Sequence, residues 1–196
     1  MGDDDLFVLE TERLYIRLAT LDDIDLFLAL WNDPRVMAPA GTPLERQISR
    51  KEIAQKIQTQ TDGIIGNLLV IELKISGISL GECFISTPDK RGVVQADIKL
   101  FPAFWGHRYG VEVREVLLEY AFKNPYIKAV EIKSGVGDPG LIEMIEDSGG
   151  ERVSDGSDEF SGEMRGYTVP EHQDIYRVTR ERWEERYNKR GHKPTE

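Results

Sequence analysis

Apolar and polar residues alternate with a period of two through RLYIRLA, residues 13–19, which is the pattern of a half-buried strand. A helix is expected to follow, because Thr20 and Asp23 resemble a helix N-cap. Its apolar face is formed by Leu26, Phe27 and Leu30. Pro34 cannot continue a helix and predicts its end. A second helix is predicted from SRKE, residues 49–52, which has the sequence of a capping box.

Three strands are predicted next: NLLVIELK (67–74), SLGECFIS (79–86) and VVQADIKLF (93–101). The segments between them are short and contain turn residues, SG at 76–77 and DKRG at 89–92. Connections of this length join neighbouring antiparallel strands. The middle of the chain is therefore predicted to form two consecutive hairpins.

A helix is predicted from Gly110 onward, because apolar residues recur at i, i+3, i+4, i+7 and i+8. These residues are Val113, Val116, Leu117, Tyr120 and Ala121. After this helix, AVEIKSGV (129–136) predicts a strand and PGLIEMIEDSGG (139–150) predicts a short helix. DIYRVT (174–179) then predicts a last strand, and RERWEERYNKRG (180–191) predicts a charged, helical tail.

This order of elements predicts an α/β protein with a mixed, mostly antiparallel sheet flanked by helices. The length of 196 residues is enough for one core, so we expect a single domain over residues 1–196. Residues 1–7 and 189–196 are expected to be flexible ends. Residues 151–170, rich in Gly, Ser, Asp and Glu, are expected to form an exposed hairpin or loop.

The net charge of −10 argues against a nucleic-acid partner, because nothing would offset phosphate repulsion. An acidic surface suits cationic partners such as amines, or it serves only solubility. One cysteine, Cys83, and three scattered histidines give no disulfide and no metal-ligand spacing. The acidic N-terminus does not resemble a signal peptide, and no apolar run has the length of a membrane span. A cytoplasmic protein without a membrane partner is expected.

The junction FWGHRYGVEV, residues 104–113, carries the first sign of chemistry. Two glycines allow a sharp turn or a close backbone approach to a ligand. A helix that opens behind such a turn presents free N–H groups and a positive dipole end. The junction is therefore either a cradle for an anion such as a phosphate or an ordinary turn between a strand and a helix.

Four stretches, in this order, resemble the GNAT superfamily of N-acetyltransferases, and within it the branch that acetylates ribosomal-protein N-termini. They are LETERLYIRLAT, WNDPRVM, FPAFWGHRYGVEVREVLLEYAF and DIYRVTRERWEE. The resemblance implies the GNAT fold and acetyl-coenzyme A as the acetyl donor. In the family, a glycine-containing loop binds the pyrophosphate of the donor through backbone amides.

The resemblance assigns the donor-binding residues. The end of the strand would lie along the pantetheine arm, with Leu100, Phe101 and Pro102. The loop would hold the pyrophosphate, with Trp105, Gly106, His107, Arg108, Tyr109, Gly110 and Val111. Asp138 would stand where an Asn of the family contacts the donor.

The chain departs from the family pattern at several of its positions. Arg108 stands where the loop has its first glycine, and a left-handed backbone there would cost about 1–2 kcal/mol. Its guanidinium would either contact a phosphate or point into solvent. At five further positions the family has Glu, Asn, Ser, Tyr and Phe. This sequence has there, respectively, Gln95, Asp138, Leu141, Ile145 and Gly150.

Two carboxylates are candidates for the general base that accepts the amine proton. Asp97 shares one face of its predicted strand with Gln95 and Lys99, the face where the family Glu would project. Glu82 on the neighbouring strand is the second candidate. The alternative for each is a carboxylate on a solvated face or in an ion pair, with Lys99 as the neighbour.

The leading hypothesis is an N-acetyltransferase that moves an acetyl group from acetyl-coenzyme A to a primary amine by direct attack in a ternary complex. The acceptor would be a protein N-terminus or a small amine such as a polyamine or an amino sugar. The alternatives are a non-catalytic protein of the same fold that binds an acyl-coenzyme A, and a binding module without a cofactor.

Overall fold

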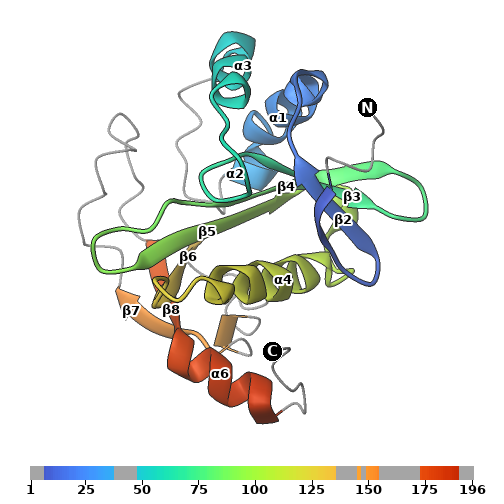
Figure 1. Ribbon diagram of the computed structural model, residues 1–196. Coiled ribbons are helices and arrows are strands. Elements are labelled where there is room, and N and C mark those ends of the chain that lie inside the picture. Colours follow the sequence, from blue (N-terminus) through green and yellow to red (C-terminus); the bar gives the residue numbers. More distant parts are fainter. Residues whose placement is uncertain (1–6, 38–47, 136–144, 147–148, 155–172, 190–196) are drawn as a thin grey trace.

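The computed structural model describes residues 7–37, 48–135, 145–146, 149–154 and 173–189 (Figure 1). The strands are β1 (Phe7–Glu10), β2 (Leu14–Leu18), β3 (Leu69–Leu73), β4 (Ile78–Ile85), β5 (Val93–Leu100), β6 (Ala129–Gly135), β7 (Glu151–Ser154) and β8 (Gln173–Thr179). The helices are α1 (Ile24–Trp31), α2 (Pro34–Met37), α3 (Arg50–Gln58), α4 (Tyr109–Lys123) and α6 (Arg180–Lys189), with 3-10 turns η2 (Leu21–Asp23) and η3 (Pro102–Phe104).

The described strands form one sheet of eight in the order β1-β2-β3-β4-β5-β6-β8-β7. Every neighbouring pair is antiparallel except β5 and β6, which are parallel. The predicted mixed, mostly antiparallel sheet and its two central hairpins are therefore confirmed. The parallel pair needs a crossover connection, and α4 supplies it.

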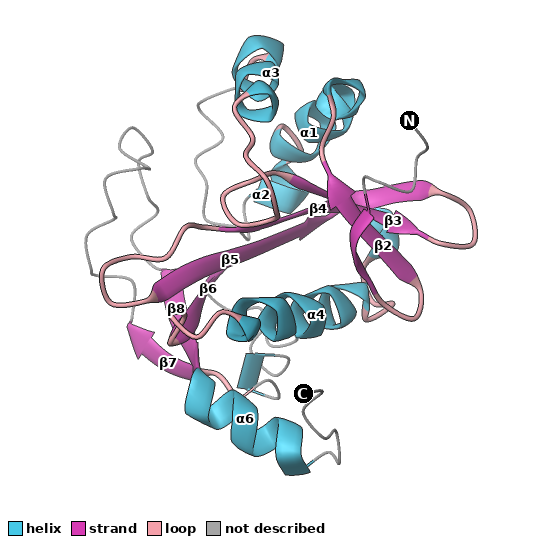
Figure 2. Cartoon of the chain, viewed as in Figure 1, coloured by secondary structure: helices cyan, strands magenta, loops and turns pink. Residues whose placement is uncertain are grey.

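Helix α4 covers one face of the sheet, and α1 and α3 cover the other (Figure 2). The core on the α4 side joins the predicted apolar stripe of α4, including Val113 and Leu117, to Leu14 and Ile16 of β2. A separate core on the opposite side joins Phe27 of α1 to residues of α3 and β3. The free Cys83 is buried in the first of these cores. The two faces are therefore built by different helices and can carry different chemistry.

Predicted helix starts are confirmed at both caps. Thr20 and Asp23 form a capping box at η2, which leads directly into α1, and Ser49 does the same with Glu52 at α3. Pro34 ends α1 as predicted but also opens the short helix α2, because proline is tolerated in a first helical turn. Most of the predicted helix 139–150 lies outside the described residues. No helix in the described ranges is long and apolar enough to cross a membrane.

Strands β5 and β6 separate before either of them ends. Their paired register runs from Val93 with Ala129 to Ala96 with Ile132. Beyond it, β5 continues to Leu100 paired with β4, and β6 continues paired with β8. The sheet is thus open between β5 and β6 at their carboxyl ends.

Antiparallel pairing identifies the backbone groups that face this opening. Ser86 N–H donates to Gln95 O at 2.8 Å, and Phe101 N–H donates to Leu80 O at 3.0 Å. Backbone groups alternate in direction along a strand, so the odd-numbered residues of β5 bond to β4. The N–H and C=O of Ile98 therefore point into the opening.

A buried ion pair anchors the start of α1 to the sheet. Arg17 donates two hydrogen bonds of 2.7 Å to the carboxylate of Asp23, and its Nε donates to Glu72 at 2.7 Å. Burial has the largest single effect on the pKa of Asp23 and raises it, but Arg17 and Thr20 together hold that pKa below its ordinary value. The ion pair thus keeps Asp23 ionised although only 7% of the residue is exposed.

The substitution Arg17→Met should lower the free energy of unfolding by about 3–5 kcal/mol, because it leaves a buried carboxylate unpaired. Since the pKa of Asp23 is lowered by folding, this stabilisation is present above the ordinary carboxylate pKa and is lost as the pH falls through the folded-state value. Denaturant titrations between pH 3 and about pH 7 would measure both effects. Arg35→Met is the matched control, because Arg35 pairs with Asp33 in an exposed position. A loss no larger than the control's would contradict the prediction.

Candidate functional site

The turn between β5 and α4 forms a shallow backbone cradle. After η3, Gly106 has a φ of +77° and Arg108 a φ of +63°, and α4 begins at Tyr109. Arg108 occupies the N-cap position, and its side chain does not cap the helix. The first N–H groups of a helix have no acceptor within it. The amides of Tyr109, Gly110 and Val111 are therefore available to a ligand.

Arg108 adopts the left-handed conformation that the family pattern assigns to glycine. Its φ and ψ are 63° and 16°, and it is the one non-glycine residue with positive φ in the described chain. Such a conformation costs about 1–2 kcal/mol for a residue with a Cβ. Strain of this kind persists where surrounding contacts hold it. The contacts around the turn supply that support.

Arg13 of the β1–β2 connection fixes the turn from outside. Its guanidinium donates to the carbonyl of His107 at 3.2 Å and to the carboxylate of Glu112 at 2.7 Å, and it lies 4.4 Å from the centre of the Tyr109 ring. Because Glu112 also accepts the backbone N–H of Arg13 at 2.9 Å, the first turn of α4 is attached to the β1–β2 connection. The conformation of the turn is therefore held by contacts within the protein.

Trp105 connects the cradle to the opening in the sheet. Its indole Nε1 donates to Leu100 O at 2.8 Å, and its own carbonyl lies 2.9 Å from Nδ1 of His107. The Trp105 side chain nevertheless remains 47% exposed. The backbone carbonyls of Leu100 and Ile98 both point into the opening. The carbonyl of Leu100 has a hydrogen-bond partner in Trp105, whereas the backbone groups of Ile98 face the opening itself.

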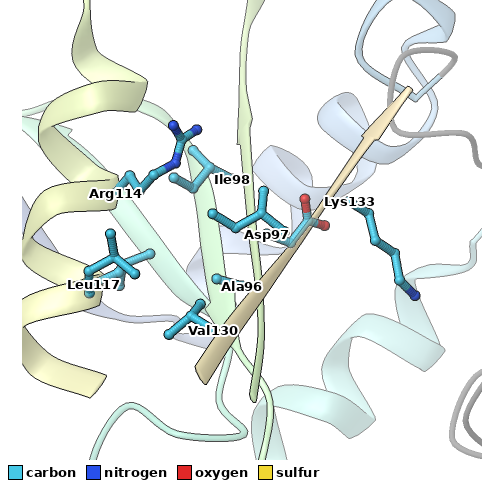
Figure 3. Close-up of a pocket in the computed structure, with 9 residues that line it drawn as sticks. Ala96, Asp97, Ile98, Arg114, Leu117, Val130 and Lys133 are labelled. Atoms are coloured by element: carbon cyan, nitrogen blue, oxygen red, sulfur yellow. The ribbon is translucent and has the colours of Figure 1, made fainter. Parts of the chain in front are cut away.

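A cavity of about 50 Å³ lies at the closed end of the opening. Ala96 and Ile98 of β5 form one wall, and the other walls come from β6 and α4 (Figure 3). The remaining lining residues are Asp97, Arg114, Leu117, Leu118, Val130, Ile132 and Lys133. Side chains of β5 at even positions pack toward α4, so the predicted division of β5 into two faces is confirmed.

The two predicted carboxylates come together around Lys99. Lys99 and Glu82 are register partners, with Nζ and Oε1 at 3.4 Å, and Lys99 also forms an ion pair with Asp97. Glu82 is 3% exposed and accepts a hydrogen bond from the indole of Trp31 in α1. Asp97 is half exposed, at 49% of its side chain. Of the two carboxylates, Asp97 is the one that is exposed on the α1 face.

Burial, the largest effect, and the nearby Asp97 raise the pKa of Glu82, while Lys99 and Trp31 act in the opposite direction. For Lys99, burial alone would lower the pKa, but Asp97 and Glu82 together raise it. The lysine is therefore held as a cation between two carboxyl groups. This cluster lies on the α1 face, opposite the α4 face on which the cavity is lined.

Arg114 was not predicted as a site residue. It is 3% exposed and lines the cavity from α4. A charged residue in a helix is usually expected on the solvent side. The signal in the sequence was the apolar residues that follow it at i+4 and i+8, Leu118 and Phe122, both of which are buried.

Other departures from the family pattern have partial explanations. Asp138 and Leu141 lie outside the described residues. Ile145 is fully buried in the core, and a Cβ on Gly150 would lie 2.4 Å from its Cγ2. Gly150 therefore has no room for a side chain beside Ile145. Within the described ranges, no group of three or more His, Cys, Asp or Glu side chains is arranged to hold a metal.

Comparison with known proteins agrees with this geometry. A family model described as an acetyltransferase (GNAT) domain matches residues 13–151. The chain is 26% identical over 127 residues to the uncharacterized N-acetyltransferase p20 of Bacillus licheniformis, covering 64% of this chain and 71% of that protein.

Solved structures share the fold at low identity. A spermidine N-acetyltransferase from Vibrio cholerae, in complex with CoA and spermine, superposes with a TM-score of 0.70 at 14% identity, covering 87% of this chain and 98% of that one. A ribosomal-protein-alanine N-acetyltransferase from Brucella melitensis gives a TM-score of 0.63 at 19% identity, covering 84% and 98%. Since the family model spans more than half of the sequence, the chain belongs to the GNAT family of N-acetyltransferases.

Proposed function

We propose that this protein transfers the acetyl group of acetyl-coenzyme A to a primary amine by direct attack. The observation that carries the proposal is the opening between β5 and β6, which joins the cradle at Tyr109 to the carboxylate cluster at Asp97. A donor that lies in the opening is reached from the α4 face, and an amine from the α1 face. The two substrates would then meet without crossing a closed sheet.

The residues at the opening fit the donor. The helix N-terminus beyond Arg108 offers backbone amides and a positive dipole end to a pyrophosphate. The backbone of Ile98 offers a donor and an acceptor to the amide groups of a pantetheine arm, which would run along Leu100, Phe101 and Pro102. Bound acetyl-coenzyme A supplies an activated acetyl group as a thioester.

The α1 face, from which the amine would approach, has one exposed carboxylate that could act as the base and one buried carboxylate that could not. Asp97 is the accessible carboxylate and would accept the proton of the attacking amine, directly or through a water. Glu82 has no access to solvent and instead holds Lys99 and Trp31 in place. A free backbone N–H such as that of Ile98 is the type of group that stabilises charge on the thioester oxygen.

The acceptor is proposed as a protein N-terminus or a small polyamine. The net charge of −10 favours a cationic acceptor of either kind. Among the solved structures of this fold, one is named for ribosomal-protein alanine and another holds spermine. The second candidate function, a non-catalytic protein that binds acyl-coenzyme A, is favoured by Ile145, which replaces a family tyrosine and is fully buried.

Acetyl-coenzyme A at 100 times its dissociation constant should stabilise the protein by about 2.7 kcal/mol, measured as an upward shift of the melting temperature. Thiol release from acetyl-coenzyme A against polyamines and peptide N-termini then separates the two functions. Binding with turnover of any amine supports the enzyme. Binding without turnover supports the second candidate, and an unchanged melting curve at saturating donor contradicts both.

The substitution Gly110→Val should weaken donor binding severely while the protein stays folded. A Cβ at Gly110 would meet only Leu100 Cδ1, at 3.9 Å, so the core has room for it. The added side chain would instead crowd a phosphate at the helix N-terminus. Isothermal titration with coenzyme A measures the loss, and circular dichroism tests the fold.

Arg108→Gly separates the two roles left open for this arginine. Glycine removes the cost of the left-handed backbone and should therefore raise the melting temperature. Weaker binding of coenzyme A would show that the guanidinium contacts a phosphate. Unchanged or tighter binding would show that it points into solvent.

Wild-type affinity in Gly110→Val would contradict the placement of the cradle itself.

The substitution Asp97→Asn should reduce turnover by about two to four orders of magnitude, because it removes the base while preserving the shape of the side chain. Donor affinity should barely change. Steady-state kinetics over a range of pH values measure both.

Glu82→Gln is the matched control, because it removes the neighbouring charge of the same cluster and keeps an acceptor for Trp31. It should alter stability more than turnover. If Glu82 were the base instead, its raised pKa would place the acidic limb of the pH–rate profile above the ordinary carboxylate range. The Glu82→Gln variant would then lose this limb. Wild-type turnover in Asp97→Asn would show that the amine loses its proton elsewhere.

A further inference from the structure

Among the described residues, Arg114 is a buried cation that forms no ion pair. Only 3% of it is exposed, and its Nε and Nη1 have no hydrogen-bond partner. Its acidic neighbour on α4, Glu115, is bonded to Arg186 at 3.0 Å. Asp97, which lines the same cavity, forms its ion pair with Lys99. Glu115 and Asp97 are therefore each bonded to another cation.

The side chain stays charged in this position. Burial lowers the pKa of Arg114 to about 10, and Glu115 opposes the change. A pKa of this value leaves the guanidinium protonated at neutral pH. A buried charge without a partner destabilises a folded protein. Groups of this kind occur often at functional sites, where a ligand of opposite charge can provide the partner.

The cavity beside Arg114 has the form of a site for a short aliphatic chain. Ala96, Ile98, Leu117 and Val130 give it apolar walls. In Figure 3, Arg114 reaches from α4 toward Ile98, whereas the charged ends of Asp97 and Lys133 point away from α4. One water requires about 10–15 Å³, so a cavity of about 50 Å³ accommodates about three to five heavy atoms. One or two methylene groups and a carboxylate together have about four or five.

We propose that Arg114 binds the terminal carboxylate of the acyl group, so that the donor site takes a short dicarboxylic acyl thioester of coenzyme A, of the malonyl or succinyl class, in preference to acetyl. The inference rests on the proposed function, which places the thioester in the opening between β5 and β6. The apolar walls would hold the methylene groups, and the guanidinium would hold the carboxylate.

The transfer breaks and forms the same bonds, and moves the same protons, for an acetyl donor and for a dicarboxylic acyl donor. The amine nitrogen forms a bond to the thioester carbonyl carbon, and the carbon–sulfur bond breaks. An acceptor that starts as an ammonium ion first releases one proton to solvent. The attacking neutral amine then loses a second proton to the base, and the departing coenzyme A thiolate takes up one proton. The distal carboxylate is unchanged, so the acceptor becomes an amide that carries a free acid in place of its positive charge.

Direct binding of coenzyme A, acetyl-coenzyme A, malonyl-coenzyme A and succinyl-coenzyme A to the full chain tests the inference. We expect the malonyl or the succinyl thioester to bind about 10- to 100-fold more tightly than the acetyl thioester, as for a hydrogen bond to a charged group. Mass spectrometry of acceptor products should show the acid-bearing amide.

Arg114→Met should bind all three acyl thioesters with the affinity that the wild type has for acetyl-coenzyme A. Arg114→Lys should keep part of the preference, because it keeps the charge. The unliganded Arg114→Met variant should melt at a higher temperature than the wild type, because an unpaired buried charge is removed. A structural role for Arg114 predicts the opposite shift. Arg91→Met, which removes an exposed arginine that pairs with Asp89 and does not line the cavity, should leave donor preference unchanged.

The wild-type donor comparison decides the inference even where a variant does not fold. Equal or weaker binding of both dicarboxylic thioesters, with normal acetyl transfer, overturns the inference and leaves the proposed function standing. A preference that survives in Arg114→Met also overturns it. If neither coenzyme A nor any thioester binds, the proposed function fails and the inference fails with it.

Discussion

Separation of two parallel strands is the constraint on which this structure depends. The pairing of β5 with β6 stops at Ala96 and Ile132, and backbone groups beyond that point lose their strand partners. Unpaired buried backbone groups are costly, so a strand interior open in this way needs ligands, water or side chains to satisfy it. Trp105 satisfies one of these groups at Leu100. The rest of the opening stays available.

The sheet also separates two electrostatic environments. On the α4 face, Arg114 lies in a cavity with mostly apolar walls, and the helix N-terminus beyond Arg108 adds positive potential. On the α1 face, Glu82 and Asp97 share Lys99. In the proposed reaction, an anionic donor and a cationic acceptor would each be attracted to a different face of the sheet. The two would meet where the strands separate, and there the positioning of charged groups would have most effect.

Much of the fold was predictable because its elements are long enough to show a period. The strands from residue 69 to residue 100 and helix α4 follow their apolar patterns closely. Strands β1 and β7 and helix α2 have four residues each, which is too short for a pattern. Tertiary contacts decide such segments.

The site was predictable to a different extent. The loop from Trp105 to Gly110 follows a family pattern, and the glycine-like conformation of Arg108 followed from it. The burial of Arg114 could not be derived, because its charge and its apolar neighbours Leu118 and Phe122 predict opposite faces of the helix. Sequence rules fail in this way at sites that sacrifice stability for binding. The opening between β5 and β6 likewise gives no signal along either strand alone.

The free backbone of Ile98 amounts to a strand edge in the interior of a sheet. Exposed edges normally invite pairing with another chain, but this one is only a few residues long, has α4 on one side and ends at the ring of Trp105. A peptide strand would need a longer ladder than this to bind stably. A slender molecule with widely spaced amides needs only one or two such contacts. In the proposed function, the architecture would therefore select its ligand by thickness and amide spacing before any side chain is involved.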